Sequence, residues 1–321
     1  GSSSELDLFR GIRRRLQRLR RRRRISLEDA QLQHLGPYLV PWQEQLQSVR
    51  MTAADGSHTE YSARDESGRR VTVRIVDASS PEMRSRIENE IWCLKHFGGG
   101  DIVALEASKW QSLPHGMLAA GIMLRRPRGT LSDLVLSGEA EDIPRRQKLI
   151  LIMEILRALQ KMSRKGWLHR DVNPKNIHIV GRCDGKGGCH AKLDGLGHAV
   201  ELKRLRRRKD LASDGNKMYA APEVWLQSGD LAKMDVWSVG RIAYDLFVGA
   251  PPVMGHLEIR GQRFMAPYTI DLDSDRGFRL LQERDPHVAR FIAGMLVERP
   301  WRRLSVRRAL KKASRLARQA G

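Results

Sequence analysis

The sequence predicts an α+β fold with two lobes, a small β-rich N-terminal lobe and a larger helical C-terminal lobe, preceded by an Arg-rich helical extension. Residues 47–77 alternate like a three-stranded meander, with a turn signal at Asp55-Gly56. Residues 144–165 instead place apolar side chains at the spacing of a core-facing helix. A chain of 321 residues with 41% hydrophobic content can bury the core of one two-lobed domain.

This pattern divides the chain into four segments. Residues 1–4 look like a cloning remnant without an initiator Met, and we expect any native signal peptide to have been removed. Residues 5–45 are predicted to form the Arg-rich helical extension, residues 46–126 the small lobe and residues 127–321 the large lobe. The sequence has no run of roughly 18 apolar residues, so it predicts no segment that spans a bilayer.

The charge of the chain favours anionic partners. Lys and Arg number 58 against 37 Asp and Glu, a formal net charge of +21, which favours acidic membranes, phosphates or nucleic acid. Residues 10–24 contain ten arginines and no acid, and the apolar residues among them recur at helical steps. We predict that residues 5–24 form an amphipathic helix that lies on an anionic membrane surface. The alternative is a helix that packs its apolar stripe on the protein body and leaves its arginines in water.

A motif at residues 169–176 organises the large lobe. These residues read H-R-D-V-N-P-K-N and precede the short strand pattern of residues 177–180. They resemble the catalytic loop of protein kinases, H-R-D-x-x-x-x-N, in which the Asp takes the proton of the substrate hydroxyl and the Asn holds a metal. The resemblance assigns Asp171 as the base and Asn176 as a metal ligand, whereas Asn173 replaces the lysine of that loop.

Further motifs resemble the structural parts of the same fold. Glu223 ends an A-P-E motif, and Asp235 opens a D-V-W-S-V-G run that is similar to the buried helix of the kinase large lobe. Arg303 stands where kinases place the arginine that pairs with the A-P-E glutamate. The resemblance implies that these three residues hold the lobe together and take no part in chemistry. The basic run Lys203–Lys209 is either a solvated loop or a docking site for an acidic partner.

Several parts of a kinase nucleotide site are replaced. The first hairpin has only Gly56 at a tight turn and no G-x-G-x-x-G, so the glycine loop that approaches the phosphates is absent or replaced. Val71–Arg74 reads V-T-V-R where kinases have V-A-I-K, so the planar fork of Arg74 replaces the phosphate-binding lysine. Glu90, in a helix predicted over residues 81–97, matches the helix glutamate of kinases, which predicts an Arg74–Glu90 ion pair. The alternative is a solvated surface glutamate.

Residues 192–199 allow two alignments with different chemistry. They read K-L-D-G-L-G-H-A, and on the kinase pattern K-L-x-D-F-G-x-A this places Gly195 at the metal-binding aspartate. A second register keeps Asp194 as the metal ligand but requires one extra residue.

The resemblance to protein kinases runs from Gln47 to Leu310. The missing glycine loop, the Arg-rich amphipathic N-terminus and the general basicity together resemble the secreted with-no-Gly-loop kinases and pseudokinases of apicomplexan parasites. That resemblance implies secretion into the parasitophorous vacuole or the cyst wall, with basic helices on vacuolar membranes. The family contains active kinases and pseudokinases, so it implies neither activity nor its loss.

Two of the three cysteines could form a disulfide in a secreted protein. Cys183 and Cys189 lie six positions apart on either side of a Gly-rich loop, and a disulfide can close there if the two flanking strands pair. Zinc is not expected, because His178 and His190 supply no second cysteine pair. Cys93 is then the odd thiol, which we expect to be a buried small hydrophobe.

The replaced residues predict a catalytically inactive pseudokinase that acts as a scaffold or allosteric partner. It is expected to be a monomer without a cofactor, to bind an unidentified protein, and to keep Asp171 as a vestigial base and Arg74–Glu90 as a vestigial phosphate-site pair. The alternative is an unconventional active Ser/Thr protein kinase that binds ATP and Mg²⁺, with Asp171 as base and Asn176 and Asp194 as metal ligands. Charge alone favours a third hypothesis, that the protein binds nucleic acid. The sequence has no nucleic-acid-binding motif and only 6% aromatic residues, so we expect no specific nucleic-acid partner.

Overall fold

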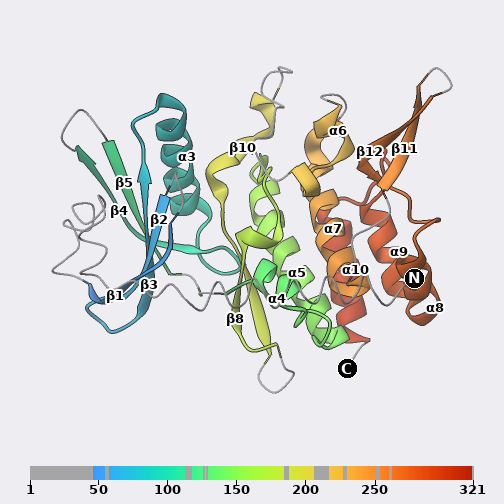
Figure 1. The fold of residues 1–321 in the computed structure, drawn as a ribbon, viewed down its shortest axis with the longest axis horizontal. Coiled ribbons are helices and arrows are strands. Elements are labelled where there is room, and N and C mark those ends of the chain that lie inside the picture. The colour runs from blue at the N-terminus through green and yellow to red at the C-terminus, as the bar shows by residue number, and fades with distance from the viewer. Residues whose placement is uncertain are drawn as a thin grey trace. The chain divides into compact units, whose positions relative to one another are not determined.

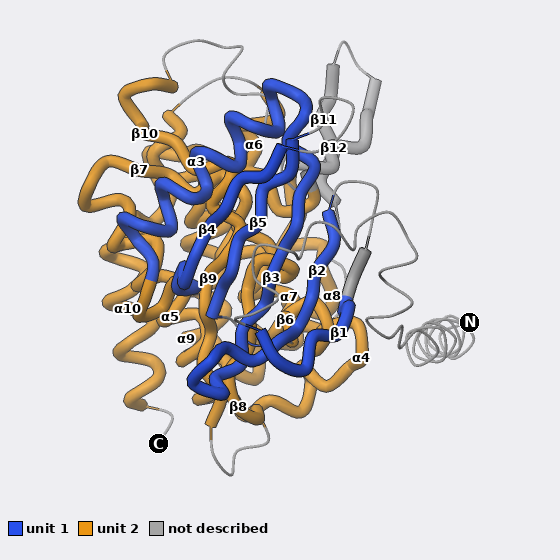
Figure 2. The backbone as a smooth tube through the Cα atoms, turned by 90° about the vertical axis from the view of Figure 1, so that its left-hand side faces the viewer, with its two compact units in different colours: residues 1–98, 103–128 blue, residues 99–102, 129–321 orange. Residues whose placement is uncertain are grey.

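The computed structural model describes residues 46–54, 58–112, 118–125, 127, 129–183, 188–205, 217–226, 230–249, 254–259 and 262–319. The predicted extension at residues 5–45, the Gly56 turn and most of the basic run Lys203–Lys209 lie outside the described residues. The chain forms two compact units (Figure 2), a smaller one of residues 1–98 and 103–128 and a larger one of residues 99–102 and 129–321. This division falls two residues beyond the predicted lobe boundary at 126 and 127.

In its described residues the smaller unit has a five-stranded antiparallel sheet and one long helix (Figure 1). The strands, in spatial order, are β1 (Gln47–Ala54), β2 (His58–Arg64), β3 (Arg70–Asp77), β5 (Leu118–Arg125) and β4 (Ala104–Ser112). Alternate residues of β3, Val71, Val73 and Ile75, are buried with Tyr61 in the core of the sheet. The predicted meander is therefore β1 to β3. No residue of β4 is buried, so this edge strand lacked the apolar alternation that would have predicted it.

The helix of the smaller unit, α3 (Pro81–Phe97), has the bounds that the sequence predicts. Ser80 caps its first turn by accepting a hydrogen bond from the Met83 backbone N–H at 3.1 Å, and Pro81 occupies the first helical position. Gly98 follows its last turn, and a Cβ at Gly98 would clash with the Leu94 carbonyl oxygen. Local signals therefore determine both ends of this helix.

The larger unit is mainly helical. Its helices are α4 (Leu131–Ser137), α5 (Arg145–Ser163), α6 (Pro222–Trp225), α7 (Met234–Val248), α8 (Arg276–Arg284), α9 (Pro286–Met295) and α10 (Val306–Arg318). Helix α7 is buried on almost every side. Both α7 and α10 pack against α5 and α9 (Figure 1). The described helices include none that is long and apolar enough to cross a bilayer.

Short strands complete the larger unit. One sheet has the order β6 (Gly129–Thr130), β8 (Ile177–Gly181) and β9 (Cys189–Leu193); two others pair β7 (Trp167–Leu168) with β10 (Val200–Glu201) and β11 (Met254–Ile259) with β12 (Gln262–Ile270). The loop of residues 169–176 runs from β7 to β8, so both of its ends are fixed by strand pairing. The β11–β12 hairpin was not predicted. The sheet-rich smaller unit and the helical larger unit confirm the predicted α+β fold class.

Candidate functional site

The loop of residues 169–176 is held by its backbone to α7. The carboxylate of Asp235, which is buried in the first turn of α7, accepts the backbone N–H of His169 at 2.8 Å and that of Arg170 at 2.9 Å. Arg170 adopts φ +69°, a conformation that a residue with a side chain rarely occupies, and the bond to Asp235 stabilises it. Asp235 thus holds the start of the loop to α7 through two backbone hydrogen bonds.

Asp171 is bound by two amide side chains of the same loop. Asn173 Nδ2 donates to Asp171 Oδ1 at 2.9 Å, and Asn176 Nδ2 donates to Asp171 Oδ2 at 2.8 Å. Both amides also donate to the Asp171 carbonyl oxygen, at 3.1 and 2.8 Å. Asn173 accepts the Lys175 backbone N–H at 3.0 Å, so it closes the loop on itself where a catalytic-loop lysine would present a cation.

Gly195 lies directly beside the side chain of Asn176. It has φ +79°, and a Cβ at this position would lie 2.5 Å from Asn176 Cγ and Nδ2 and 2.7 Å from Oδ1. The Asp194 backbone N–H donates to the Asn176 carbonyl oxygen at 2.8 Å, which fixes the two segments together. A side chain at position 195 would thus point at Asn176, and the present backbone leaves no room for one.

The carboxylate of Asp194 is buried and engaged elsewhere. Its Oδ1 accepts the Gly195 backbone N–H at 2.8 Å, and its Oδ2 lies 3.2 Å from His178 Nε2. Asp194 is 2% exposed and His178 is 5% exposed. Within the described part of the chain, no group of three His, Cys, Asp or Glu residues is placed to hold a metal ion.

The contact between His178 and Asp194 was not predicted, because strand parity reveals it only once the register of the β8–β9 hairpin is known. In the β8–β9 ladder His178 pairs with Lys192. Because side chains alternate between the faces of a sheet, Asp194, two residues after Lys192, returns to the face of His178. Finding this contact requires the register of the hairpin, which the sequence did not supply.

Arg74 and Glu90 form an ion pair within the smaller unit. Arg74 Nη2, on β3, donates to Glu90 Oε1, on α3, and the two side chains are 15% and 10% exposed. Glu90 lies on the buried face of α3 with Ile91 and Leu94, which is unlike a solvated surface glutamate. Burial and the neighbouring Glu90 raise the pKa of the Cys93 thiol to about 12, as expected for an inert buried cysteine.

Glu223 and Arg303 form a fully buried bidentate pair in the larger unit. Arg303 Nη1 and Nη2 donate to the two Glu223 carboxylate oxygens at 2.5 and 2.8 Å. The guanidinium also donates to three backbone carbonyls and lies over the Trp237 ring, 5.1 Å from its centroid. Every donor direction of Arg303 is thus used for structure, and nothing of the pair is left for a substrate.

The segment after Gly195 is anchored near its start and again near its end. Val200 pairs with Leu168 in the β7–β10 ladder. Of the basic run, Lys203 and Arg204 are described, and both contact Glu201, at 2.7 and 3.5 Å. Farther along, the Tyr219 hydroxyl donates to the partly buried Asp245 of α7 at 2.7 Å.

The structure joins Cys183 and Cys189 in a disulfide. Cys189 begins β9 and is fully buried, and the Cα atoms of the two cysteines are 4.9 Å apart. The β8–β9 ladder pairs Gly181 with Cys189, which brings the two ends of the loop together. The pairing of strands on which the sequence prediction depended is therefore present.

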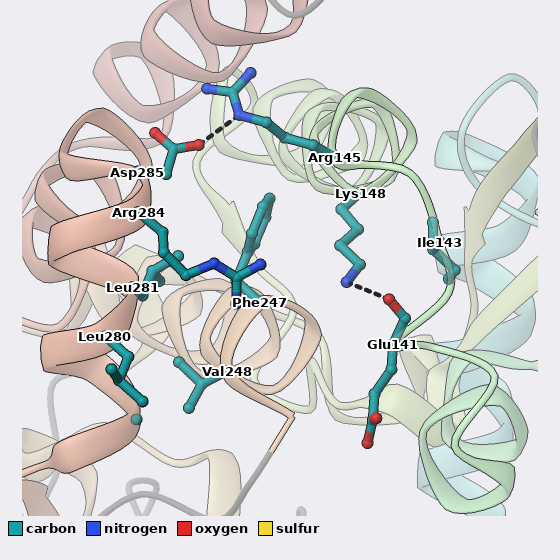
Figure 3. A pocket seen from close by; sticks show the side chains of 11 residues that line it. Glu141, Ile143, Arg145, Lys148, Phe247, Val248, Leu280, Leu281, Arg284 and Asp285 are labelled. Carbon is teal, nitrogen blue, oxygen red and sulfur yellow. Dashed lines mark hydrogen bonds and ion pairs between the residues drawn. The ribbon is translucent and has the colours of Figure 1, made fainter.

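A separate cavity of about 440 Å³ lies in the larger unit between α5, α7 and α8 (Figure 3). None of the predicted site residues lines it. Its most buried polar group is Lys148, whose ammonium donates to the Glu141 carbonyl oxygen at 3.2 Å and lies over the Phe247 ring. The apolar side chains of Val248, Leu280 and Leu281 line the opposite wall.

Comparison with known proteins identifies the family. The family model described as protein kinase domain matches residues 56–313. Human serine/threonine-protein kinase D2 is 28% identical over 199 residues, which cover 61% of this chain and 22% of that protein. Mouse serine/threonine-protein kinase D3 is 26% identical over 199 residues, 61% of this chain and 21% of that protein. The putative CBL-interacting protein kinase 27 of Oryza sativa subsp. japonica is 27% identical over 268 residues, 75% of this chain and 59% of that protein.

The chain thus spans about a fifth of the length of the two kinases D and less than two thirds of the rice protein. The family model, by contrast, matches most of the chain, from β2 to α10, including residues 169–176, Glu223 and Arg303. Sequence match and architecture agree, and the chain belongs to the protein kinase family.

Proposed function

We propose that this protein is a pseudokinase, a kinase-fold scaffold or allosteric partner that transfers no phosphate at an appreciable rate. The observation that carries the proposal is the contact between Gly195 and Asn176. In an active kinase a carboxylate at the first position of D-F-G and the catalytic-loop asparagine hold the metal ions. Here the residue beside Asn176 has no side chain, and the Asp194 carboxylate is occupied by His178 and a backbone N–H.

Phosphoryl transfer depends almost wholly on positioning and electrostatic stabilisation. Arg74 replaces the phosphate-binding lysine and is engaged by Glu90, and Asn173 removes a second cation. Losing one preorganised charge contact typically lowers the rate by about a hundred- to thousandfold, or roughly 3 to 4 kcal/mol. Even with strong non-additivity, two such losses leave no useful turnover. Asp171 then remains as a loop-stabilising acceptor with nothing to deprotonate.

The retained contacts support a role for the folded body itself. Asp235 still anchors the loop, and the Glu223–Arg303 pair still ties α6 to the segment before α10. None of these contacts requires nucleotide or metal, so the proposed pseudokinase needs neither as a cofactor. It acts as a monomer that binds a protein partner.

We also propose the narrower relationship to the secreted with-no-Gly-loop kinases and pseudokinases. It is supported by the absence of G-x-G-x-x-G and by the ten arginines of residues 10–24. Under this proposal the protein is secreted into the parasitophorous vacuole or the cyst wall and associates peripherally with an anionic membrane through residues 5–24. A disulfide between Cys183 and Cys189 is consistent with that compartment.

The competing function is an unconventional active kinase in which Asp194 supplies the metal carboxylate. It is favoured by the retention of Asp171 and Asn176 at hydrogen-bond distance from each other. For this mechanism the Asp194 side chain has to leave His178 and reach a metal held by Asn176. That rearrangement exposes a carboxylate that is now 2% exposed.

Radiolabelled phosphate transfer from ATP, to the protein itself and to a generic acceptor, tests the two functions. We expect the wild type to transfer no more than Asp171→Ala, with Mg²⁺ or with Mn²⁺. Because Asp194 is buried, Asp194→Ala is paired with Asp194→Asn and with thermal melts, and the exposed Asp273→Ala serves as the control. Transfer that is lost in folded Asp171 and Asp194 variants but kept in Asp273→Ala would overturn the pseudokinase proposal.

A thermal-shift titration with ATP tests the cofactor part separately. We expect Mg²⁺ or Mn²⁺ to add nothing to any shift that ATP causes alone, because Gly195 supplies no second carboxylate beside Asn176 to share a metal ion. A metal-dependent shift that disappears in Asp194→Asn would instead assign the metal to Asp194.

A further inference from the structure

The C-terminal helix α10 presents an uncompensated cationic face. Its buried residues, Ala309, Ala313, Leu316 and Ala317, lie on the side that packs against α5 and α9. The opposite side carries six exposed cations, which are Arg307, Arg308, Lys311, Lys312, Arg315 and Arg318. None of the six side chains forms an ion pair or hydrogen bond with a residue that the structure describes. The sequence after Glu298 contains no acidic residue at all.

This arrangement is unfavourable for the helix on its own. Like charges four residues apart, such as Arg308 and Lys312, repel each other on the helix surface. Arg307 and Arg308 lie in the first turn, which contains no acid, although the helix dipole favours negative charge there. Both effects are relieved when an anionic ligand covers the face. An ordinary solvated surface intersperses the two signs of charge.

A small pocket beside this face is lined by basic groups from two helices. It has a volume of about 120 Å³, and its polar side chains are His287 and Arg290 from α9 and Lys312 and Arg315 from α10. Phe291 and Leu316 form the rest of the lining, and no carboxylate contributes to it. Asp285, the N-cap residue of α9, is held by Arg145. The pocket has the size and charge to take one phosphate group.

We propose that the outer face of α10, with the α9–α10 pocket, binds the phosphate groups of an anionic phospholipid surface. The six cations are spread over roughly 16 Å of one straight helix face, at 1.5 Å per residue, which suits a flat array of headgroups. The outer face of α10 has no aromatic side chain and Phe291 of the pocket is buried, so bases have no exposed ring on which to stack and single-stranded nucleic acid fits less well. The inference does not depend on residues 5–24 or on whether the protein transfers phosphate, although both membrane contacts would meet the same kind of surface.

The test measures how the full chain partitions onto phosphatidylcholine vesicles with and without phosphatidylserine. Lys312→Glu/Arg315→Glu reverses two charges of the pocket, and Arg276→Glu/Arg279→Glu makes the same charge change at exposed positions of α8. We expect the α10 variant to bind phosphatidylserine vesicles at least about tenfold more weakly than the α8 variant, from the contribution of each basic residue near an anionic surface. Equal partitioning of the two variants would overturn the proposal.

Further arms separate the sources of phosphate and the state of the fold. If the α10 variant loses only a thermal shift caused by inorganic phosphate, or only binding to an oligonucleotide, while vesicle binding is unchanged, the phospholipid proposal is wrong. The α10 variant should melt no lower than the wild type, because the substitutions relieve repulsion at exposed positions. If it melts lower, the variant Lys312→Gln/Arg315→Gln, which removes two positive charges without adding negative ones, replaces it. Arg276→Gln/Arg279→Gln is then the control, and we expect a smaller loss of vesicle binding in the same direction.

Discussion

At the scale of single residues, the chemistry of this protein depends on which side chains meet in the loop of residues 169–176. Asn176 has a kinase-like partner in Asp171 but faces a glycine on its other side. Asn173 closes the loop where a lysine would reach outward. Replacing one residue of such a site changes what its neighbours can do, because a metal or phosphate is held by several groups at once.

Gly195 should be intolerant of any side chain. Gly195→Ala places a Cβ 2.5 Å from Asn176 in a residue with φ +79°. Gly166→Ala is the matched control, since Gly166 has φ +74° but a Cβ there meets nothing within 4 Å. We expect the control to lose roughly 1 to 2 kcal/mol of unfolding free energy from backbone strain, and Gly195→Ala to lose about 1 to 3 kcal/mol more from overpacking. Equal losses in urea unfolding would show that Asn176 moves aside freely.

Lys148 should make the free energy of unfolding increase as the pH becomes alkaline. Burial, with a smaller effect of Arg284, lowers the pKa of Lys148 below its ordinary 10.5, against opposing effects of Glu141 and Asp142. At a pH between the lowered pKa of the folded protein and the ordinary pKa of 10.5, Lys148 binds more protons in the unfolded chain than in the folded one. The free energy of unfolding therefore rises with pH up to about 10.5. The excess unfolding free energy of wild type over Lys148→Met should therefore grow from neutral pH towards 10.5. Lys311→Met, at an exposed position, gives the baseline for removing one lysine, and a difference that does not grow beyond it would contradict the prediction.

At the scale of elements, the helices with local start and stop signals were predicted well. Helix α3 has the predicted bounds, and α5 (Arg145–Ser163) lies within the predicted 144–165. Capping by Ser80 and the stop at Gly98 are local, so the sequence contains them. Strand β4 and the β11–β12 hairpin were not predicted, because their pairing partners, and not an apolar alternation, define them.

The β8–β9 hairpin should carry a disulfide in the purified protein. The strand register and the 4.9 Å Cα separation allow Cys183 and Cys189 to bond. Alkylation of the denatured, unreduced protein followed by mass spectrometry should label Cys93 alone, and reduction should add two labels. Two free thiols in the 183–189 peptide before reduction would show that the bridge is absent.

At the scale of the whole molecule, positive charge is concentrated at both ends of the sequence. Residues 10–24 contain ten arginines without an acid, and residues 299–318 contain nine Lys and Arg without an acid. The net charge of +21 therefore does not describe an evenly basic surface. The first block was predicted to bind a membrane, whereas no role was predicted for the second.

Deleting residues 5–24 should weaken binding to phosphatidylserine vesicles and leave the melting temperature almost unchanged. Each arginine near an anionic surface contributes about 1 kcal/mol, so the loss should exceed roughly a hundredfold, with the α10 face supplying the remaining binding. The control replaces the ten arginines of residues 10–24 by glutamine and keeps the length of the chain. A large fall in melting temperature would instead favour a helix that packs on the protein body.

From the amino-acid sequence alone the fold class and the loop motif with Asp171 and Asn176 could be predicted, because a motif or a periodic pattern is complete within the chain. The pairing of Glu223 with Arg303, 80 positions apart, was implied by the resemblance to protein kinases. The folded structure was needed to show that the Asp194 carboxylate turns to His178, that Gly195 lies against Asn176, and that the cations of α10 share one exposed face. The direction of a side chain and its burial depend on strand register and on which helix face packs, and elements distant in sequence set both.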